Sequence, residues 1–138
     1  MYSDLHSDDI TTLTYHPSNP SILLSGSTDG LVNISDTSIA DEDEVVSRTL
    51  NLNASVHRAG FLGPTQVYAL SHDERFAVYD VQEVEGKADA VRDFGDMRAA
   101  IGCRYVADVV AKVDGSGAIV GAGAQEYVPS ILVLVVLV

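Results

Sequence analysis

Short runs of alternating apolar and polar residues dominate the chain, and this period predicts β-strands rather than helices. Residues Ile10–Tyr15, Ile22–Ser27 and Leu31–Ser35 are each about six residues long and rich in β-branched or other apolar side chains. Pro17 and Pro20 break the chain after the first run, because proline lacks the amide hydrogen that a strand ladder requires. An Asp-Gly pair marks a tight turn after the second run. Together these features predict an antiparallel meander of three strands.

The same layout returns 44 residues later along the chain. Three further strands are predicted, at Val56–Leu62, Val67–Ser71 and Phe76–Tyr79. The offset superimposes Asp29 on Asp73 and Asp36 on Asp80. Repeats of about 40–45 residues have the period of propeller blades. A chance coincidence of two meanders is the alternative interpretation.

Each meander is followed by a candidate outer strand. Val45–Leu52 fits this role in the first unit, and Ala88–Phe94 fits it in the second. A short helix over Ala88–Ala100 competes with the latter strand, although Gly95 weakens it. We therefore expect a first unit at residues 1–53 and a second at residues 54–100.

A third and partial unit is expected at residues 101–138. Its predicted strands are Cys103–Val110 and Ala118–Gly123, joined by an Asp-Gly-Ser-Gly turn. Ile131–Val138 is an unbroken apolar run, far shorter than the roughly 20 residues of a membrane helix. It is interpreted either as a buried strand or as an artefact of the chain end, and no membrane association is expected.

Several marks of the first unit resemble one blade of the WD-repeat family. They are His6, Asp9, His16-Pro17, Leu24-Ser25-Gly26-Ser27, Asp29-Gly30 and Ser35-Asp36. The resemblance implies an all-β fold made of antiparallel four-stranded blades of a WD-repeat β-propeller. The chain holds about two and a half such blades, so the propeller is incomplete. The function that the resemblance implies is a non-catalytic protein-interaction scaffold.

The resemblance also implies roles for particular side chains. Blades of the family commonly contain a buried hydrogen-bond network, to which His6, Ser25 and Asp29 correspond by position in this sequence. Ser35 stands where the family has tryptophan and therefore cannot complete the network in the usual way. In the second blade only Asp73 persists from this set.

The residues that correspond to the family's blade-closing dipeptide differ between the two blades. Asp36 closes the first blade, and Asp80 closes the second. Tyr79 stands in the second blade at the place of the family's tryptophan.

Charge and cysteine content narrow the classes of partner. Twenty acids against eight bases give a formal net charge of −12, which disfavours nucleic-acid binding and favours proteins or peptides, above all basic ones. The single cysteine, Cys103, excludes an internal disulfide and favours an intracellular setting in the cytoplasm or the nucleus. It is expected to be a small core residue.

No catalytic constellation, metal site or cofactor site is evident in the sequence. Its four histidines lack the close spacing of metal ligands, and no serine lies in a nucleophile-elbow motif. The chain is therefore not expected to be an enzyme. Two alternatives stay open: a propeller-type hydrolase that uses carboxylates and histidines on its face, and a truncated product without function.

Two surfaces are expected to take part in association. The loops at His16–Ser21 and Ser71–Arg75 are candidate binding surfaces for partner proteins. An unclosed set of blades also leaves unpaired strand edges, through which the chain could associate with itself.

Overall fold

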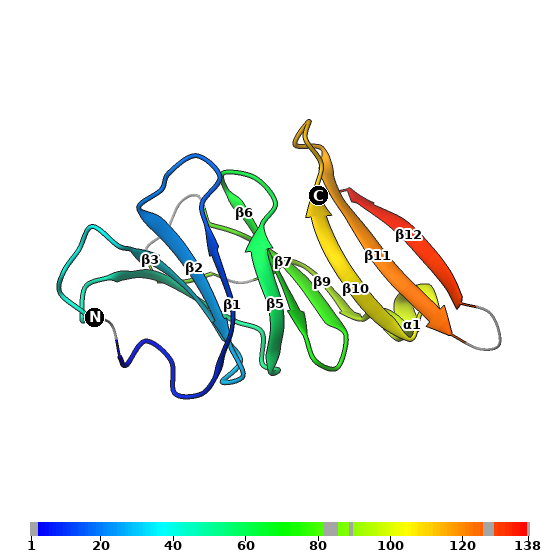
Figure 1. Cartoon of the computed structure of the whole chain (residues 1–138), viewed down its shortest axis with the longest axis horizontal. Coiled ribbons are helices and arrows are strands. Elements are labelled where there is room, and N and C mark those ends of the chain that lie inside the picture. The colour runs from blue at the N-terminus through cyan, green and yellow to red at the C-terminus, as the bar shows by residue number, and fades with distance from the viewer. Residues whose placement is uncertain (1–2, 82–85, 89, 126–128, 138) are drawn as a thin grey trace.

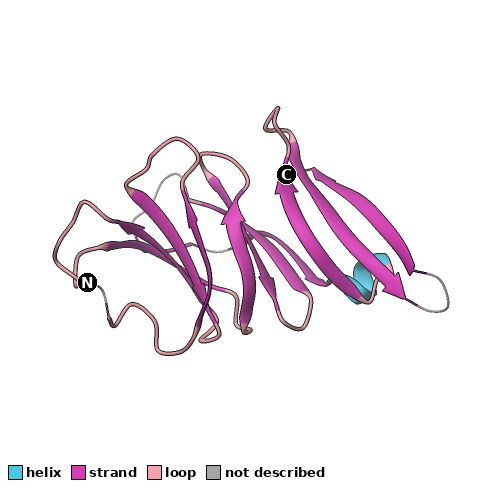
Figure 2. Ribbon diagram, viewed as in Figure 1, coloured by secondary structure: helices cyan, strands magenta, loops and turns pink. Residues whose placement is uncertain are grey.

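The computed structural model contains three β-sheets that lie side by side in a row (Figure 1). The structure describes residues 3–81, 86–88, 90–125 and 129–137. Strands account for most of the described chain, and the single described helix is a short one (Figure 2). The sheets follow one another in chain order and do not close into a ring.

The first sheet has the strand order β1-β2-β3-β4-β8. Its strands are β1 (Ile10–Tyr15), β2 (Ile22–Ser27), β3 (Leu31–Asp36), β4 (Val46–Asn51) and β8 (Gly86–Ala88). The four consecutive strands are antiparallel, as expected of a blade. Strand β8 comes from the range predicted for the second unit, yet it pairs in parallel with β4.

The second sheet has the order β5-β6-β7-β9 and is antiparallel throughout. It comprises β5 (Val56–Phe61), β6 (Gln66–Ser71), β7 (Arg75–Asp80) and β9 (Ala90–Asp96). The outer strand therefore lies two residues beyond its predicted range. A helix does follow, but α1 (Met97–Ile101) overlaps only the last four residues of the Ala88–Ala100 range considered for the competing helix and ends one residue beyond it. Asp96 caps this helix by accepting a bond from the Arg98 amide, and Gly102 ends it at φ 69°.

The third sheet has the order β10-β11-β12. Its strands are β10 (Tyr105–Ala111), β11 (Gly117–Gln125) and β12 (Pro129–Leu137). Strand β12 pairs along its whole length with β11, so the strand interpretation of the apolar C-terminal run describes it correctly. Only its last residue, Val138, lies outside the described residues.

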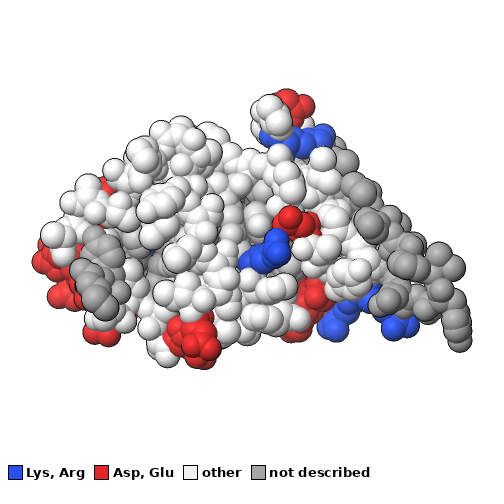
Figure 3. All heavy atoms as spheres, viewed as in Figure 1, with Lys and Arg blue, Asp and Glu red and all other residues white. Residues whose placement is uncertain are grey.

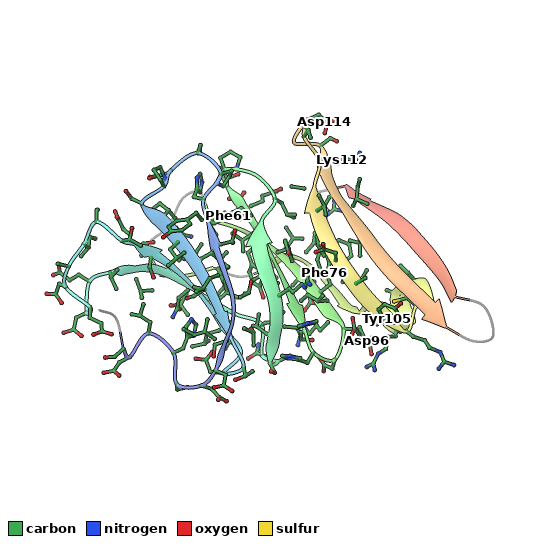
Figure 4. All side chains as sticks on the ribbon, in the orientation of Figure 1. Phe61, Phe76, Asp96, Tyr105, Lys112 and Asp114 are labelled. Carbon is green, nitrogen blue, oxygen red and sulfur yellow. The ribbon has the colours of Figure 1, made fainter. Side chains whose placement is uncertain are left out.

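Two apolar cores separate the three sheets, and the alternation of side chains along each strand explains them. On β6, Val67 and Ala69 pack towards the first sheet, whereas Tyr68 and Leu70 pack towards the third. Strand β7 divides in the same way, with Phe76 in the core shared with the third sheet (Figure 4). Burial on both faces explains why these strands read as nearly continuous apolar runs.

The cores also account for Cys103, which is buried with its thiol donating to the Met97 carbonyl oxygen. Burial raises the pKa of this thiol. In the described part of the chain, no helix has the length and apolar character that a membrane span requires.

Candidate functional site

A serine, a histidine and an aspartate form a chain of hydrogen bonds at the first sheet. His6 lies in the segment that precedes β1, and its ring joins two groups. Its Nδ1 atom lies 3.0 Å from Oδ2 of Asp29, and its Nε2 atom lies 2.8 Å from Oγ of Ser25. The His6 and Asp29 side chains are only 2% and 6% exposed. We call these three residues the His6 network.

Turn geometry holds Asp29 in place. Its carboxylate accepts bonds from the amides of Leu31, at 2.9 Å, and Ser7, at 3.0 Å, besides the contact with His6. Burial alone would raise the pKa of Asp29, but these hydrogen bonds outweigh burial and the pKa is lowered. Gly30 completes the turn at φ +89°, a conformation that glycine adopts without strain.

Asn33 extends the network, although no role for it was predicted. Its Nδ2 atom donates to the Leu5 carbonyl oxygen at 2.6 Å, and its Oδ1 atom accepts from the Thr49 hydroxyl at 2.9 Å. The segment before β1 is thus fastened to β3 as well as to β2. The sequence pattern did not point to Asn33, because a lone asparagine in a strand has no characteristic spacing.

A hollow of about 240 Å³ lies beside the His6 network on the outer face of the first sheet. Leu13, Leu23, Ser25 and Ser35 are among its lining residues. The Ser35 hydroxyl is buried and has no hydrogen-bond partner among the described residues. Ser35 is the residue that stands where the resemblance places tryptophan, so the hollow adjoins the position of the absent indole.

The second sheet has a different arrangement at the equivalent positions. Asp73 accepts from the Ser71 hydroxyl within one turn, and among the described residues no histidine joins it. Tyr79 is buried against the first sheet, and its hydroxyl lies 3.4 Å from the Asn51 carbonyl oxygen. Burial raises the pKa of Tyr79.

The two closing aspartates lie at the ends of their strands. Asp36 ends β3, where it accepts from the amide and the hydroxyl of Ser38, and its amide donates to the Val45 carbonyl oxygen. The Ser38 hydroxyl, followed by the Ser38 amide, lowers the pKa of Asp36. Asp80 ends β7 in an exposed position.

The chain is similar in sequence to several WD repeat-containing proteins. The chain is 40% identical over 111 residues to an uncharacterized WD repeat-containing protein of Saccharomyces cerevisiae, covering 77% of this chain and 28% of that protein. It is 36% identical over 123 residues to an uncharacterized WD repeat-containing protein of Schizosaccharomyces pombe, covering 83% and 37%. It is 32% identical over 103 residues to the WD repeat-containing protein 89 homolog of Dictyostelium discoideum, covering 72% and 28%. No family model matches the chain.

A solved structure supports the fold. The β-propeller domain of Cps50 (Swd1) from Myceliophteria thermophila superimposes with a TM-score of 0.63 at 19% identity, covering 85% of this chain and 36% of that one. The three sheets are WD-repeat propeller blades. The chain spans less than two fifths of the length of each of these relatives.

The His6 network in the first WD-repeat blade has the atom order of a serine hydrolase triad. A hydrolase also needs donors aimed at a developing oxyanion, and backbone amides usually supply them. Here Ser25 lies in β2, between β1 and β3, where the ladders on both sides engage the surrounding amides. The geometry therefore favours a structural role for the network, which fixes the segment before β1 against the blade.

The loops predicted to bind partners lie at opposite ends of the WD-repeat blades. His16–Ser21 joins β1 to β2 at the upper end in Figure 1, where the His16 ring contacts the Pro64 carbonyl oxygen at 2.9 Å. Ser71–Arg75 joins β6 to β7 at the lower end. Antiparallel strands reverse direction at each turn, so successive loops alternate between the two ends.

Consecutive turns form a continuous lower rim. It consists of Ser7–Asp9, Thr28–Gly30, Leu52–Ser55 and His72–Glu74. Three backbone hydrogen bonds link these segments in turn: Thr28 to Asp9, Leu52 to Gly30, and His72 to Ser55, each at 3.0 Å. The rim holds no lysine or arginine, and Asp8, Asp9 and Asp73 are exposed on it.

Ion pairs and histidine contacts between strands were also not predicted. Arg58 on β5 pairs with Asp108 on β10 at 2.8 Å and so connects the second blade to the third. The rings of His57 and His72 stack with centroids 4.8 Å apart. Within the described residues, no three histidine, cysteine, aspartate or glutamate side chains gather closely enough to hold a metal ion.

Proposed function

We propose that the chain is a non-catalytic protein-interaction scaffold, and that its lower rim binds a basic segment of a partner protein. The observation that carries the proposal is the rim itself, whose hydrogen-bonded turns contain no lysine or arginine and present Asp8 and Asp9 to solvent. Asp73 is also exposed on the rim, but it interacts electrostatically with Arg75 and Arg98 beside it. Fixed carboxylates of one sign attract a lysine- or arginine-rich segment and repel a phosphate backbone.

Rigidity supports this assignment of the rim. The Asp8 carboxylate accepts only from the neighbouring Asp9 amide among the described contacts, at 2.9 Å, so its other lone pairs are available to a ligand. The segment that carries Asp8 and Asp9 is tied to the blade through His6, Ser7 and Leu5. A preorganised surface loses less conformational entropy on binding than a loose terminus does.

The test uses the 138-residue chain and a fluorescent lysine- and arginine-rich peptide, with binding followed by anisotropy. The double variant Asp8→Lys/Asp9→Lys is expected to weaken binding severalfold. The matched control, Asp41→Lys/Asp43→Lys, makes the same charge change in the acidic loop before β4 and is expected to keep most of the affinity. Equal loss in both variants would show that net charge alone attracts the peptide and would refute the rim as the site.

Two further measurements address the remaining parts of the proposal. A DNA oligonucleotide of similar length is expected not to bind, and tight binding would contradict the assignment to basic protein segments. An ester-hydrolysis assay of the chain and of Ser25→Ala is expected to show no turnover that depends on Ser25. We also propose an intracellular setting on the basis of the single cysteine, and secretion of the tagged chain would contradict it.

A further inference from the structure

A second cavity, of about 230 Å³, lies between the first and second blades. Residues of both blades line it, and the two sheets share one apolar core, so both walls of the cavity belong to this chain. It lies at the upper end in Figure 1, beside the loop between β1 and β2. Ser47 and Pro64, which line it, are exposed, so a ligand can reach the cavity from solvent.

Arg48 brings a positive charge to this cavity. It lies opposite Ile34 in the pairing of β4 with β3, and Ile34 packs in the core between the two blades. Residues directly opposite each other share one face of a sheet, so Arg48 stands on the face turned towards the second blade. Its surroundings are acidic, since residues 1–53 contain nine acids and Arg48 is their single lysine or arginine. On the side shown in Figure 3, acidic side chains lie over the first blade, whereas the visible lysines and arginines lie over the other two.

The Arg48 guanidinium has no carboxylate partner among the described residues, whereas the other described arginines with printed ion pairs, at positions 58, 75 and 98, each contact an aspartate at 2.6–2.8 Å. Arg48 is also half-buried, so part of its hydration is lost without the ion pair that normally compensates for it. An anionic group in the cavity supplies that pair. A single arginine in acidic surroundings suits a carboxylate, with one negative charge, better than a phosphate with nearly two.

The other polar side chains of the lining are already engaged. Nδ1 of His16 accepts from two amides of its own turn, each at 3.1 Å, so Nε2 carries the proton and donates to the Pro64 carbonyl oxygen at 2.9 Å. The Ser47 hydroxyl donates to a carbonyl oxygen of β3 at 3.0 Å. These bonds hold loops of both blades around the cavity and leave Arg48 as the lining side chain that offers donors to a ligand.

Apolar side chains also line the cavity. Ile22, Phe61 and Val81 pack at the margin of the core between the two blades. Phe61, at the upper end of β5 in Figure 4, meets the His16 ring edge-on with centroids 4.9 Å apart. Pockets for drug-sized ligands and cofactors measure about 300–1,000 Å³. A cavity of about 230 Å³ therefore suits one or two side chains of a peptide better than a cofactor.

We propose that this cavity binds a short segment of a partner protein in which an aspartate or glutamate stands next to a large apolar residue. The carboxylate pairs with Arg48 through two parallel hydrogen bonds, and the apolar side chain packs against Ile22 and Phe61. The site lies at the opposite end of the blades from the lower rim and has the opposite charge preference. The inference does not depend on what the rim binds.

Peptide binding to the 138-residue chain tests the proposal. The probes are short fluorescent peptides, each with one central glutamate between varied apolar residues, and a matched set with glutamine in its place. Some glutamate peptides are expected to bind, and their glutamine counterparts are expected to bind about tenfold more weakly, because the buried charge pair is lost. Anisotropy measures the affinities. The proposal is overturned if no glutamate peptide binds or if the glutamine peptides bind equally well.

Variants of the chain test the role of Arg48. Arg48→Gln is expected to weaken binding of the best glutamate peptide about tenfold, and Arg48→Lys, which keeps the charge, is expected to weaken it less. The matched control is Arg98→Gln, which removes an exposed arginine of α1 outside the cavity and should keep the affinity. Circular dichroism should show that Arg48→Gln folds, because no ion pair of the described residues is broken. An unfolded Arg48→Gln would assign Arg48 a structural role and overturn the proposal.

Nuclear magnetic resonance of the labelled chain locates the peptide. The glutamate peptide is expected to shift the amide signals of Ser47 and Arg48 and to leave those of Asp8 and Asp9 unchanged. Shifts confined to the rim would overturn the proposal. The double variant Asp8→Lys/Asp9→Lys should still bind the glutamate peptide, so this site and the rim can fail independently of each other.

Discussion

The first and second blades have the same strand layout, yet different interactions stabilise them. The first uses the His6 network and has a hollow beside Ser35. The second has Ala69 in place of Ser25 and Tyr79 in place of Ser35, and it is buried on both faces. A blade can therefore replace a polar network with apolar packing when a neighbouring sheet covers the relevant face.

The largest expected effect comes from giving the second blade the side chain of the first. Tyr79→Ser removes a buried aromatic ring from the core between the two blades and is expected to cost about 3–5 kcal/mol of unfolding free energy. Urea unfolding followed by circular dichroism measures it. Tyr15→Ser, at an exposed position, serves as the control and should change stability little. If Tyr79→Ser lowers the unfolding free energy no more than the control Tyr15→Ser does, the expected contribution of Tyr79 to core packing is contradicted.

The next largest effect on stability is expected from the turn aspartates, Asp29 in the first blade and Asp73 in the second. Asp29→Asn weakens contacts that tie the segment before β1 to the blade and is expected to cost about 1–3 kcal/mol at neutral pH. Asp73→Asn, which affects a bond inside one turn, should cost less. If the two variants are equally stable, the His6 network does not distinguish the blades.

Acid should reduce the effect of Asp29→Asn. Since the folded-state pKa of Asp29 is lowered, its stabilisation is present in full above the unfolded pKa of about 3.9 and is lost as pH falls through the folded value. The stability difference between wild type and Asp29→Asn should therefore be constant near neutral pH and shrink in strong acid. Urea unfolding at a series of pH values measures this trend, and a difference that grew with acidity would contradict it.

Filling the hollow should make the first blade more like its family. Ser35→Trp places an indole where the buried Ser35 hydroxyl has no described partner, and a gain of about 0.5–2 kcal/mol is expected from cavity filling. Ser35→Ala removes the hydroxyl without filling the space and is the control. Thermal unfolding compares the stabilities of the two variants. A Trp variant less stable than the Ala variant would show that the hollow cannot accept the ring.

The smallest effect concerns the turn that replaces Gly30 in the second blade. Glu74 has φ 67° at the equivalent position, while its carboxylate accepts from the Val106 amide at 2.7 Å. Glu74→Ala loses that bond and keeps the strained backbone, whereas Glu74→Gly loses the bond and relieves the strain. The Gly variant should be about 1 kcal/mol more stable than the Ala variant. Chemical denaturation of both variants checks the order, and the reverse order would argue against strain at this residue.

Local patterning was enough to predict the meanders, because strand alternation and turn residues act within a few positions. It also placed His6, Ser25 and Asp29 in one group through their likeness to a known blade. It did not predict β8, since the three residues Gly86–Ala88 carry no strand signal of their own and form a strand only by pairing with β4. Contacts such as Arg58 with Asp108 depend on how blades stack, which no local pattern encodes.

The parallel pairing of β8 with β4 has a consequence for how the molecule unfolds. The chain leaves the second blade after β7, adds β8 to the edge of the first, and returns as β9. Neither blade can therefore open fully without breaking a ladder that involves the other. Hydrogen exchange should consequently report these two blades as one cooperative unit, in which the edge amides of β4 are protected together with the second sheet.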